Sequence, residues 1–267
     1  MMKTIAEAAV AVLSTAEAAD KAAISRDMAA RWQQGALAHD FPVSPPDRPA
    51  RPARPELKAP REVAKRRAGG SKANRVALLH AVAHIELNAI DLAWDIVARF
   101  GARMPRGFTD DWVRVGDDEA RHFLLLSDRL AVLGAVYGDL PAHDGLWQAA
   151  DSTRHDLLAR LAVVPLVLEA RGLDVTPSMI ERLDRMGDAE SADALRIIYQ
   201  DEITHVAAGR RWLEYLCERE KVDPIDTYQK LVSRYFNGDL KPPFNEEARN
   251  SAGFPADFYV PLTTCGG

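Results

Sequence analysis

Apolar residues recur every three or four positions in four long segments of the chain. These segments run over residues 74–100, 111–133, 152–171 and 189–220. This spacing predicts amphipathic α-helices, and the two-residue alternation typical of strands is nearly absent. The four helices predict an all-α fold, with a four-helix bundle over residues 74–220 whose longest connection joins the second and third helices.

The chain before the bundle shows two different patterns. Residues 1–41 predict a helical segment, with one helix continuing from about residue 3 to 37. Residues 42–73 are rich in Pro and Arg and predict an extended arm, because proline interrupts helices and central strands. From Pro42 to Arg75, ten Lys and Arg stand against three Asp and Glu. This basic arm either binds RNA or wraps a domain, and the lack of aromatic side chains that stack on bases favours wrapping.

The chain after the bundle predicts an irregular but ordered tail. Residues 221–267 show no long helical pattern, yet they hold seven of the 19 aromatic residues, among them Phe236, Phe244, Phe254 and Tyr259. Disordered tails are rarely so aromatic, so we expect this tail to pack onto the bundle.

Composition and charge argue against several classes of protein. The 267 residues are 47% hydrophobic and 27% charged, with a formal net charge of −5, which gives no general attraction to nucleic acid or an anionic membrane. Glu7 interrupts the first apolar run, so no signal peptide is predicted, and no apolar stretch reaches the roughly 20 residues of a membrane span. Cys217 and Cys265 are too far apart for a disulfide framework, and we expect free thiols. We therefore predict a cytoplasmic protein without a membrane partner.

Each of the four predicted helices carries one glutamate on its apolar face, and two helices add a histidine three residues later. The residues are Glu86, Glu119, His122, Glu169, Glu202 and His205. Chance predicts about 0.4 Glu-x-x-His pairs for 15 Glu and 7 His in 267 residues, and the chain has two. The first two glutamates and the last two are both 33 residues apart, as two related helix hairpins would give. A single Glu-x-x-His is more often a surface pair, but the six together favour a metal site.

The chemistry of these residues suits two divalent cations. Four carboxylates buried together would raise one another's pKa values, whereas two divalent cations would balance their four charges. Carboxylate oxygen and imidazole nitrogen are donors that suit iron or manganese. Residues i and i+3 project from one face of a helix, so each Glu-x-x-His pair can reach one metal. The other two glutamates either bridge the metals or bind as terminal ligands.

The chain resembles the ferritin-like di-iron carboxylate superfamily, and within it the bacterial proteins grouped as domain of unknown function 455. The resemblance rests on LHAVAHIELNAIDLAWDIVARF, DDEARHFLLLSDRL and YQDEITHVAAGRRWL, and it extends to KPPFNEEARNSAGFPADFY in the tail. It covers roughly residues 70–260. It implies a ferritin-like four-helix bundle that holds two metal ions, with the six glutamates and histidines in the ligand positions, and it implies no particular reaction.

Three further residues bear on the site. His84 is either a structural histidine or a partner of a ligand or of the tail. Tyr199 lies one turn before Glu202 and is either a core tyrosine, the commoner case, or a hydrogen-bond partner or electron relay for the ligands. Pro165 removes a helical hydrogen bond one turn before Glu169, so we expect a distorted helix with a pocket beside it.

The resemblance leaves three functions open. The first is a dioxygen-dependent oxidase or hydroxylase of a small molecule or nucleobase, like the tRNA isopentenyladenosine hydroxylases of the superfamily. The second is iron oxidation or peroxide consumption, as in ferritins and rubrerythrins, and the third is a metal-stabilised scaffold without turnover. We favour the first, with an external electron donor, because storage ferritins have little chain beyond the bundle and no Cys-x-x-Cys donor motif is present. The substrate, the catalytic residues and the oligomeric state are left open.

Overall fold

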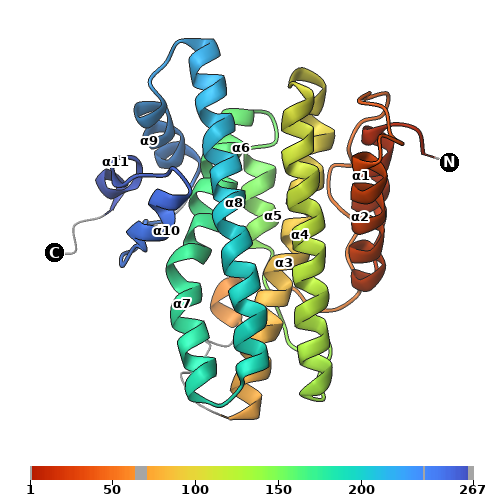
Figure 1. The fold of residues 1–267 in the computed structure, drawn as a ribbon, viewed down its shortest axis with the longest axis vertical. Helices are drawn as coiled ribbons and strands as arrows, with labels where there is room; N and C mark the ends of the chain where they lie inside the picture. Colours follow the sequence, from red (N-terminus) through yellow and green to blue (C-terminus); the bar gives the residue numbers. More distant parts are fainter. Residues whose placement is uncertain (1, 64–70, 237, 264–267) are drawn as a thin grey trace. The chain divides into compact units, whose positions relative to one another are not determined.

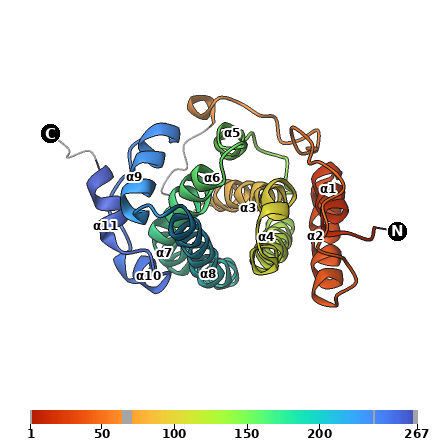
Figure 2. The same cartoon turned by 90° about the horizontal axis from the view of Figure 1, so that it is seen from above.

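The computed structural model describes residues 2–63, 71–236 and 238–263, and its regular elements in these ranges are all helices (Figures 1 and 2). The prediction of an all-α protein is thus confirmed for the described residues. The chain divides into two compact units, unit 1 (residues 1–145) and unit 2 (residues 146–267).

Unit 1 is built around a hairpin of two long helices. Its helices are α1 (Ile5–Ser14), α2 (Ala18–Gln33), the 3-10 helices η1 (Pro60–Glu62) and η2 (Gly101–Arg103), α3 (Lys72–Phe100) and α4 (Arg106–Val132). α3 and α4 lie side by side, and α2 packs on α4 (Figure 1). α1 packs on α3. Ser71 caps α3 by accepting a hydrogen bond from the Asn74 N–H. The hairpin core is the apolar face that the sequence predicts, with Val82, Ile90 and Leu126 fully or almost fully buried.

The N-terminal segment forms two helices where the apolar pattern predicts one. α1 ends at Ser14 because the Thr15 hydroxyl donates to the Ala11 carbonyl at 2.9 Å and Thr15 adopts an extended backbone. The arm also contributes to the end of α1, since the Ala50 N–H donates to the Leu13 carbonyl at 2.7 Å. The break therefore depends on a contact with a segment distant in sequence.

The arm lies against α3 and pairs two of its cations with acids of unit 1. Arg51 donates to the Asn88 side chain at 2.7 Å and forms an ion pair with Asp91 at 3.4 Å. Lys21 of α2 forms a fully buried ion pair with the same Asp91. Arg99 in turn donates to the Pro46 carbonyl at 3.2 Å. These contacts fit the wrapping interpretation of the arm. Its residues 64–70, which include three of its nine cations, lie outside the described part of the chain.

Unit 2 is built around a second hairpin. Its helices are α5 (Gly145–Ser152), α6 (Leu157–Val163), the π-helix η3 (Val164–Glu169), α7 (Ala170–Arg185), α8 (Ala189–Glu220), α9 (Pro224–Tyr235), α10 (Glu246–Ser251), α11 (Ala256–Tyr259) and the 3-10 helix η4 (Val260–Leu262). α7 and α8 lie side by side, and η3 and α6 pack on α8 (Figure 1). Cys217 is buried on α8 as a free thiol, whereas Cys265 lies outside the described residues.

The aromatic tail packs within unit 2. α9 lies against α6, α10 against α8, and α11 against α9. Arg249 of α10 is almost fully buried and donates to both carboxylate oxygens of Asp174 at 2.8 and 2.7 Å. Its guanidinium also lies 4.3 Å from the centre of the Tyr259 ring and 4.9 Å from that of Phe244. A cation that is both paired and stacked fixes the tail on α7.

One helical stretch, Lys72–Arg103, is long and apolar enough to cross a membrane by length and composition. Most of its side chains are buried in the fold, which is also how the core helix of a soluble protein behaves.

Candidate metal centre

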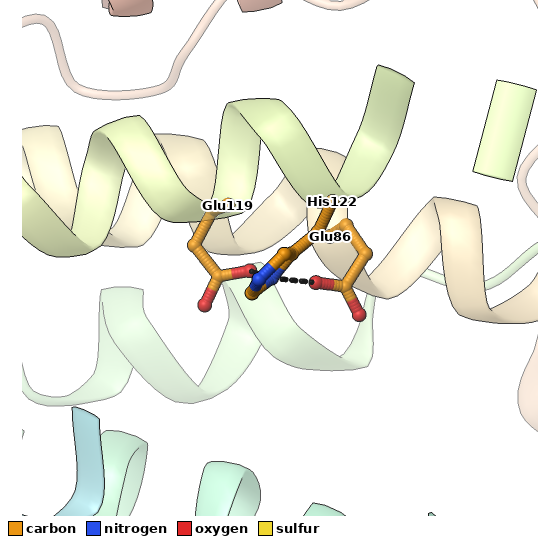
Figure 3. A group of neighbouring side chains, drawn as sticks. All are labelled: Glu86, Glu119 and His122. Atoms are coloured by element: carbon orange, nitrogen blue, oxygen red, sulfur yellow. Dashed lines mark hydrogen bonds and ion pairs between the residues drawn. The ribbon is translucent and has the colours of Figure 1, made fainter. Parts of the chain in front are cut away.

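In unit 1, three of the predicted ligands meet between α3 and α4. Glu86 comes from α3, and Glu119 and His122 come from α4, where their spacing places both on the same face. His122 Nδ1 lies 3.1 Å from Glu86 Oε2 and 3.4 Å from Glu119 Oε2. The two carboxylates flank the imidazole ring (Figure 3). One ligand atom from each residue lies within 4.8 Å of the other two, so the three could hold one metal ion.

The cluster is buried, and burial changes the pKa of Glu86. Glu119 and His122 have no exposed surface and Glu86 has almost none. Burial and, next, the negative charge of Glu119 raise the pKa of Glu86 well above its usual range, while the hydrogen bond to His122 acts in the opposite direction. Two carboxylates held this close are stabilised by a shared cation or a shared proton. A divalent ion with mixed oxygen and nitrogen ligands fits this donor set.

In unit 2, the equivalent pair lies on one face of α8. His205 Nδ1 is 3.7 Å from Glu202 Oε2, with His205 fully buried and Glu202 8% exposed. Glu169 is the last residue of η3, which packs against α8. The buried carboxylate and imidazole thus recur with the same spacing as in α4.

The expected distortion at Pro165 is confirmed. Pro165 has no N–H to continue the α-helical ladder, and Val164–Glu169 adopt a π-helix, which adds a residue to the turn. Gly209 of α8 lies directly against this segment, because a Cβ atom there would be 2.5 Å from Cβ of Pro165. A partly open cavity of about 140 Å³ borders Leu166 and the next two residues of η3, and tail residues, among them Phe236 and Phe244, also line it. The predicted pocket beside the distorted helix is therefore present, although Glu169 is not among the residues that line it.

The two residues proposed as partners of the ligands lie in separate networks. His84 Nδ1 lies 2.8 Å from the Tyr137 hydroxyl, and His84 Nε2 lies 3.0 Å from the carbonyl oxygen of His143. Burial lowers the pKa of His84 to about 4, so its ring is neutral and accepts from Tyr137 while donating to the carbonyl. Tyr199 is half-buried on α8, and its hydroxyl accepts a hydrogen bond from Asn245 of the tail at 2.8 Å.

Sequence reasoning did not find the partners of the α3 histidines. The Gly138 N–H donates to His80 Nε2 at 2.9 Å, and the Tyr137 ring stacks on His80 with 5.3 Å between ring centres. The one available signal was the i, i+4 spacing of His80 and His84, which places both rings on one side of α3. The loop that meets them has no pattern that predicts its path.

Comparison with known proteins gives a family but no activity. Residues 14–260 match the family model described as "Protein of unknown function (DUF455)". The chain is 41% identical over 223 residues to a Haemophilus influenzae (strain ATCC 51907 / DSM 11121 / KW20 / Rd) protein named "Uncharacterized protein", with 80% of this chain and 77% of that protein covered. No solved structure matches. The chain therefore belongs to the family described as protein of unknown function DUF455.

Proposed function

We propose that this protein is a di-metal carboxylate protein that uses dioxygen to oxidise a small organic substrate. In this proposal α3, α4, the α6–η3–α7 segment and α8 form a ferritin-like four-helix bundle. The six predicted ligands bind two ions of iron, with manganese as the alternative. A reduced pair of such ions supplies electrons to dioxygen when it is bound.

The observation that carries the proposal is the buried cluster of Glu86, Glu119 and His122. Surface acids and histidines often lie close together without binding a metal, but two carboxylates and an imidazole with almost no exposed surface are costly unless a cation or a shared proton balances them, and a divalent cation also suits their mixed oxygen and nitrogen donors. Glu202 and His205 repeat the arrangement on α8, and the equal 33-residue intervals link the two hairpins.

The protein's own side chains have three roles in this proposal. The carboxylates bind cations, and their burial excludes water from the oxidising site. The hydrogen bond between His122 and Glu86 fixes the orientation of the imidazole ring. The helix hairpin fixes the distances, because each ligand lies within a packed helix rather than in a loop.

The ion pairs of two arm arginines favour a small-molecule substrate over RNA. Arg51 is already paired with Asp91 and Asn88, and Arg48 forms an ion pair with Asp144 at 2.8 Å. Cations paired within the protein contribute little to phosphate binding.

The decisive experiment is elemental analysis of the purified chain and of the Glu119→Ala and Glu202→Ala variants. We expect two iron or manganese ions per chain, and a sharp fall in each variant. Asp128→Ala and Glu218→Ala are the matched controls, because both acids are exposed on the same two helices. Far-ultraviolet circular dichroism checks that each variant is folded.

The alternatives give different results in the same samples. Less than about a tenth of an equivalent of metal after anaerobic loading with ferrous iron would contradict the di-metal site. Bound metal without oxygen consumption in the presence of a reductant would instead favour the metal-stabilised scaffold. Oxygen consumption in a fixed proportion to the ferrous iron added, with several ferrous ions oxidised per dioxygen and no organic product, would favour an iron-oxidising protein.

A further inference from the structure

Unit 1 contains a solvent-open cleft that is separate from the Glu86–Glu119–His122 cluster. Its volume is about 510 Å³, within the range of small-molecule sites. Its walls come from the start of α2, from the arm, from α4 and from the loop after α4. They include Glu17, Ala53, Arg54, Phe123, Ser127, Val136 and Tyr137.

Packing beneath the cleft makes its floor rigid. The rings of Phe123 and Tyr137 form an edge-to-face pair, with 5.2 Å between centres and an angle of 85°. The α3 histidines fix the position of Tyr137, since its ring stacks on His80 and its hydroxyl forms a hydrogen bond with His84. An aromatic floor that is already fixed does not need to be ordered when a ligand binds.

The arm wall is fixed as well. The Lys58 N–H donates to the Ala142 carbonyl at 2.8 Å, and the Ala142 N–H donates to the Glu56 carbonyl at 3.0 Å. Gly138 has a φ of +104°, and a Cβ atom there would lie 3.0 Å from Cβ of Arg54, so glycine allows this close approach. The backbone of Arg54 is thereby held against the loop that carries Tyr137.

The polar groups in the walls indicate the charge of the ligand. The Arg54 side chain is exposed, and no ion pair or hydrogen bond of its guanidinium occurs among the described residues. The first residues of α2 line the same cleft, and the N–H groups of a first helical turn have no partner within their helix. Both features favour an anion. Glu17 on the rim has the opposite sign and disfavours ligands of high negative charge.

We propose that this cleft binds a small organic monoanion, with a flat apolar body on the Phe123–Tyr137 floor and a carboxylate on Arg54. The site is independent of the proposed metal function, because none of the six predicted ligands lines it. The proposal gives unit 1 a second site, which binds an organic anion rather than a metal ion.

The test uses 1-naphthoate as the probe and its uncharged analogue 1-naphthylmethanol, titrated calorimetrically into the full chain. We expect one naphthoate per chain, bound about tenfold more tightly than the alcohol, because the charge-assisted contact is available to the acid alone. Arg54→Gln should remove this difference by weakening naphthoate alone. Glu17→Gln should strengthen naphthoate binding about twofold to fivefold.

Two variants separate the cleft from other surfaces. Ala53→Trp adds an indole to an exposed wall of the cleft and should weaken both probes at least about tenfold. Arg61→Gln removes an exposed arginine from the same arm, outside the cleft, and should change neither probe by more than about twofold. Metal content should match the wild type in all four variants. No saturable naphthoate binding, or binding that Ala53→Trp and Arg54→Gln leave unchanged, would overturn the proposal.

Discussion

Gly209 of α8 and Pro165 of η3 touch so closely that no side chain fits between them. A Cβ atom at Gly209 would lie 2.5 Å from Cβ and 2.6 Å from Cγ of Pro165. The proline that disrupts the third predicted helix thus lies against a glycine of the fourth. The two residues together set how closely the π-helical turn that ends in Glu169 approaches the helix that carries Glu202.

Gly209→Ala should therefore destabilise the protein and reduce its metal content. The added methyl group forces η3 away from α8, and overpacking of this kind costs about 1–3 kcal/mol. Urea unfolding and elemental analysis measure the two effects. Gly172→Ala is the matched control, because a Cβ atom at Gly172 meets nothing within 4 Å and an alanine inside α7 should stabilise by about 0.5–1 kcal/mol. Equal effects of the two substitutions would contradict the close contact.

Glu86→Gln should have opposite effects with and without metal. Without metal, the substitution removes one of two buried carboxylates that repel each other, so the chelator-treated variant should melt at a higher temperature than the chelator-treated wild type. With metal, the variant loses a ligand and gains less stabilisation from binding. Thermal unfolding with and without ferrous iron measures both. Asp128→Asn, exposed on α4, should leave both melting temperatures unchanged. A lower melting temperature of the chelator-treated variant would argue against repulsion in the cluster.

Lys21→Met should lower the free energy of unfolding by about 3 kcal/mol, because it leaves Asp91 buried with Arg51 as a more distant partner. Denaturant titration measures the loss. The control is Arg26→Met on the same helix, whose pair with Asp117 is partly exposed and should contribute about 1 kcal/mol or less. The double variant with Asp91→Leu should recover most of the stability, since the buried carboxylate is then absent and Arg51 keeps its hydrogen bond to Asn88. A loss of less than about 1 kcal/mol for Lys21→Met would show that the pair is not buried in solution.

Protonation of His80 should lower the free energy of unfolding when the pH falls below neutral. Burial lowers the pKa of His80, the negative charge of Asp139 acts in the opposite direction, and His80 Nε2 accepts hydrogen bonds from the Gly138 and Leu140 N–H groups. Because the folded-state pKa lies below the unfolded value of about 6.5, this contribution is fully present above that pH and is lost as the pH falls below it.

The His80→Gln variant isolates this effect. Its amide oxygen can still accept from the backbone but does not titrate, so the free energy of unfolding should fall less steeply between pH 7 and 5 than in the wild type. The difference in slope is at most about 1.4 kcal/mol per pH unit for one proton. Parallel curves for the two proteins would exclude His80 as a source of the pH dependence.

Local sequence signals were sufficient where a helix is defined by its own residues. The fourth predicted helix, residues 189–220, coincides with α8, because Asp188 caps its start and Gly187 adopts a left-handed conformation just before it. The Glu119–His122 pair was equally accessible, since i, i+3 spacing on an apolar helix face depends on the helix alone.

Features that depend on contacts between distant segments could not be predicted from the sequence. The end of α1 is fixed partly by the arm, through the bond from the Ala50 N–H to the Leu13 carbonyl. The partners of His80 and His84 come from a loop whose path follows from glycine conformations and carbonyl contacts. Pro165 indicated a distortion, but nothing local in the sequence indicated its close contact with Gly209 of α8.

The buried Lys21–Asp91 pair also limits how this fold can be cut or recombined. Asp91 lies five residues after Glu86 on α3, and its counter-charges come from α2 and the arm, 70 and 40 positions earlier in the chain. If the α3–α4 hairpin were transplanted alone into another scaffold, the carboxylate of Asp91 would lose its counter-charges. This uncompensated charge would lie five residues from the predicted metal ligand Glu86. The portable module for protein design is therefore the whole of residues 1–145, and gene fusions that exchange the N-terminal segment must keep Lys21 and Asp91 together.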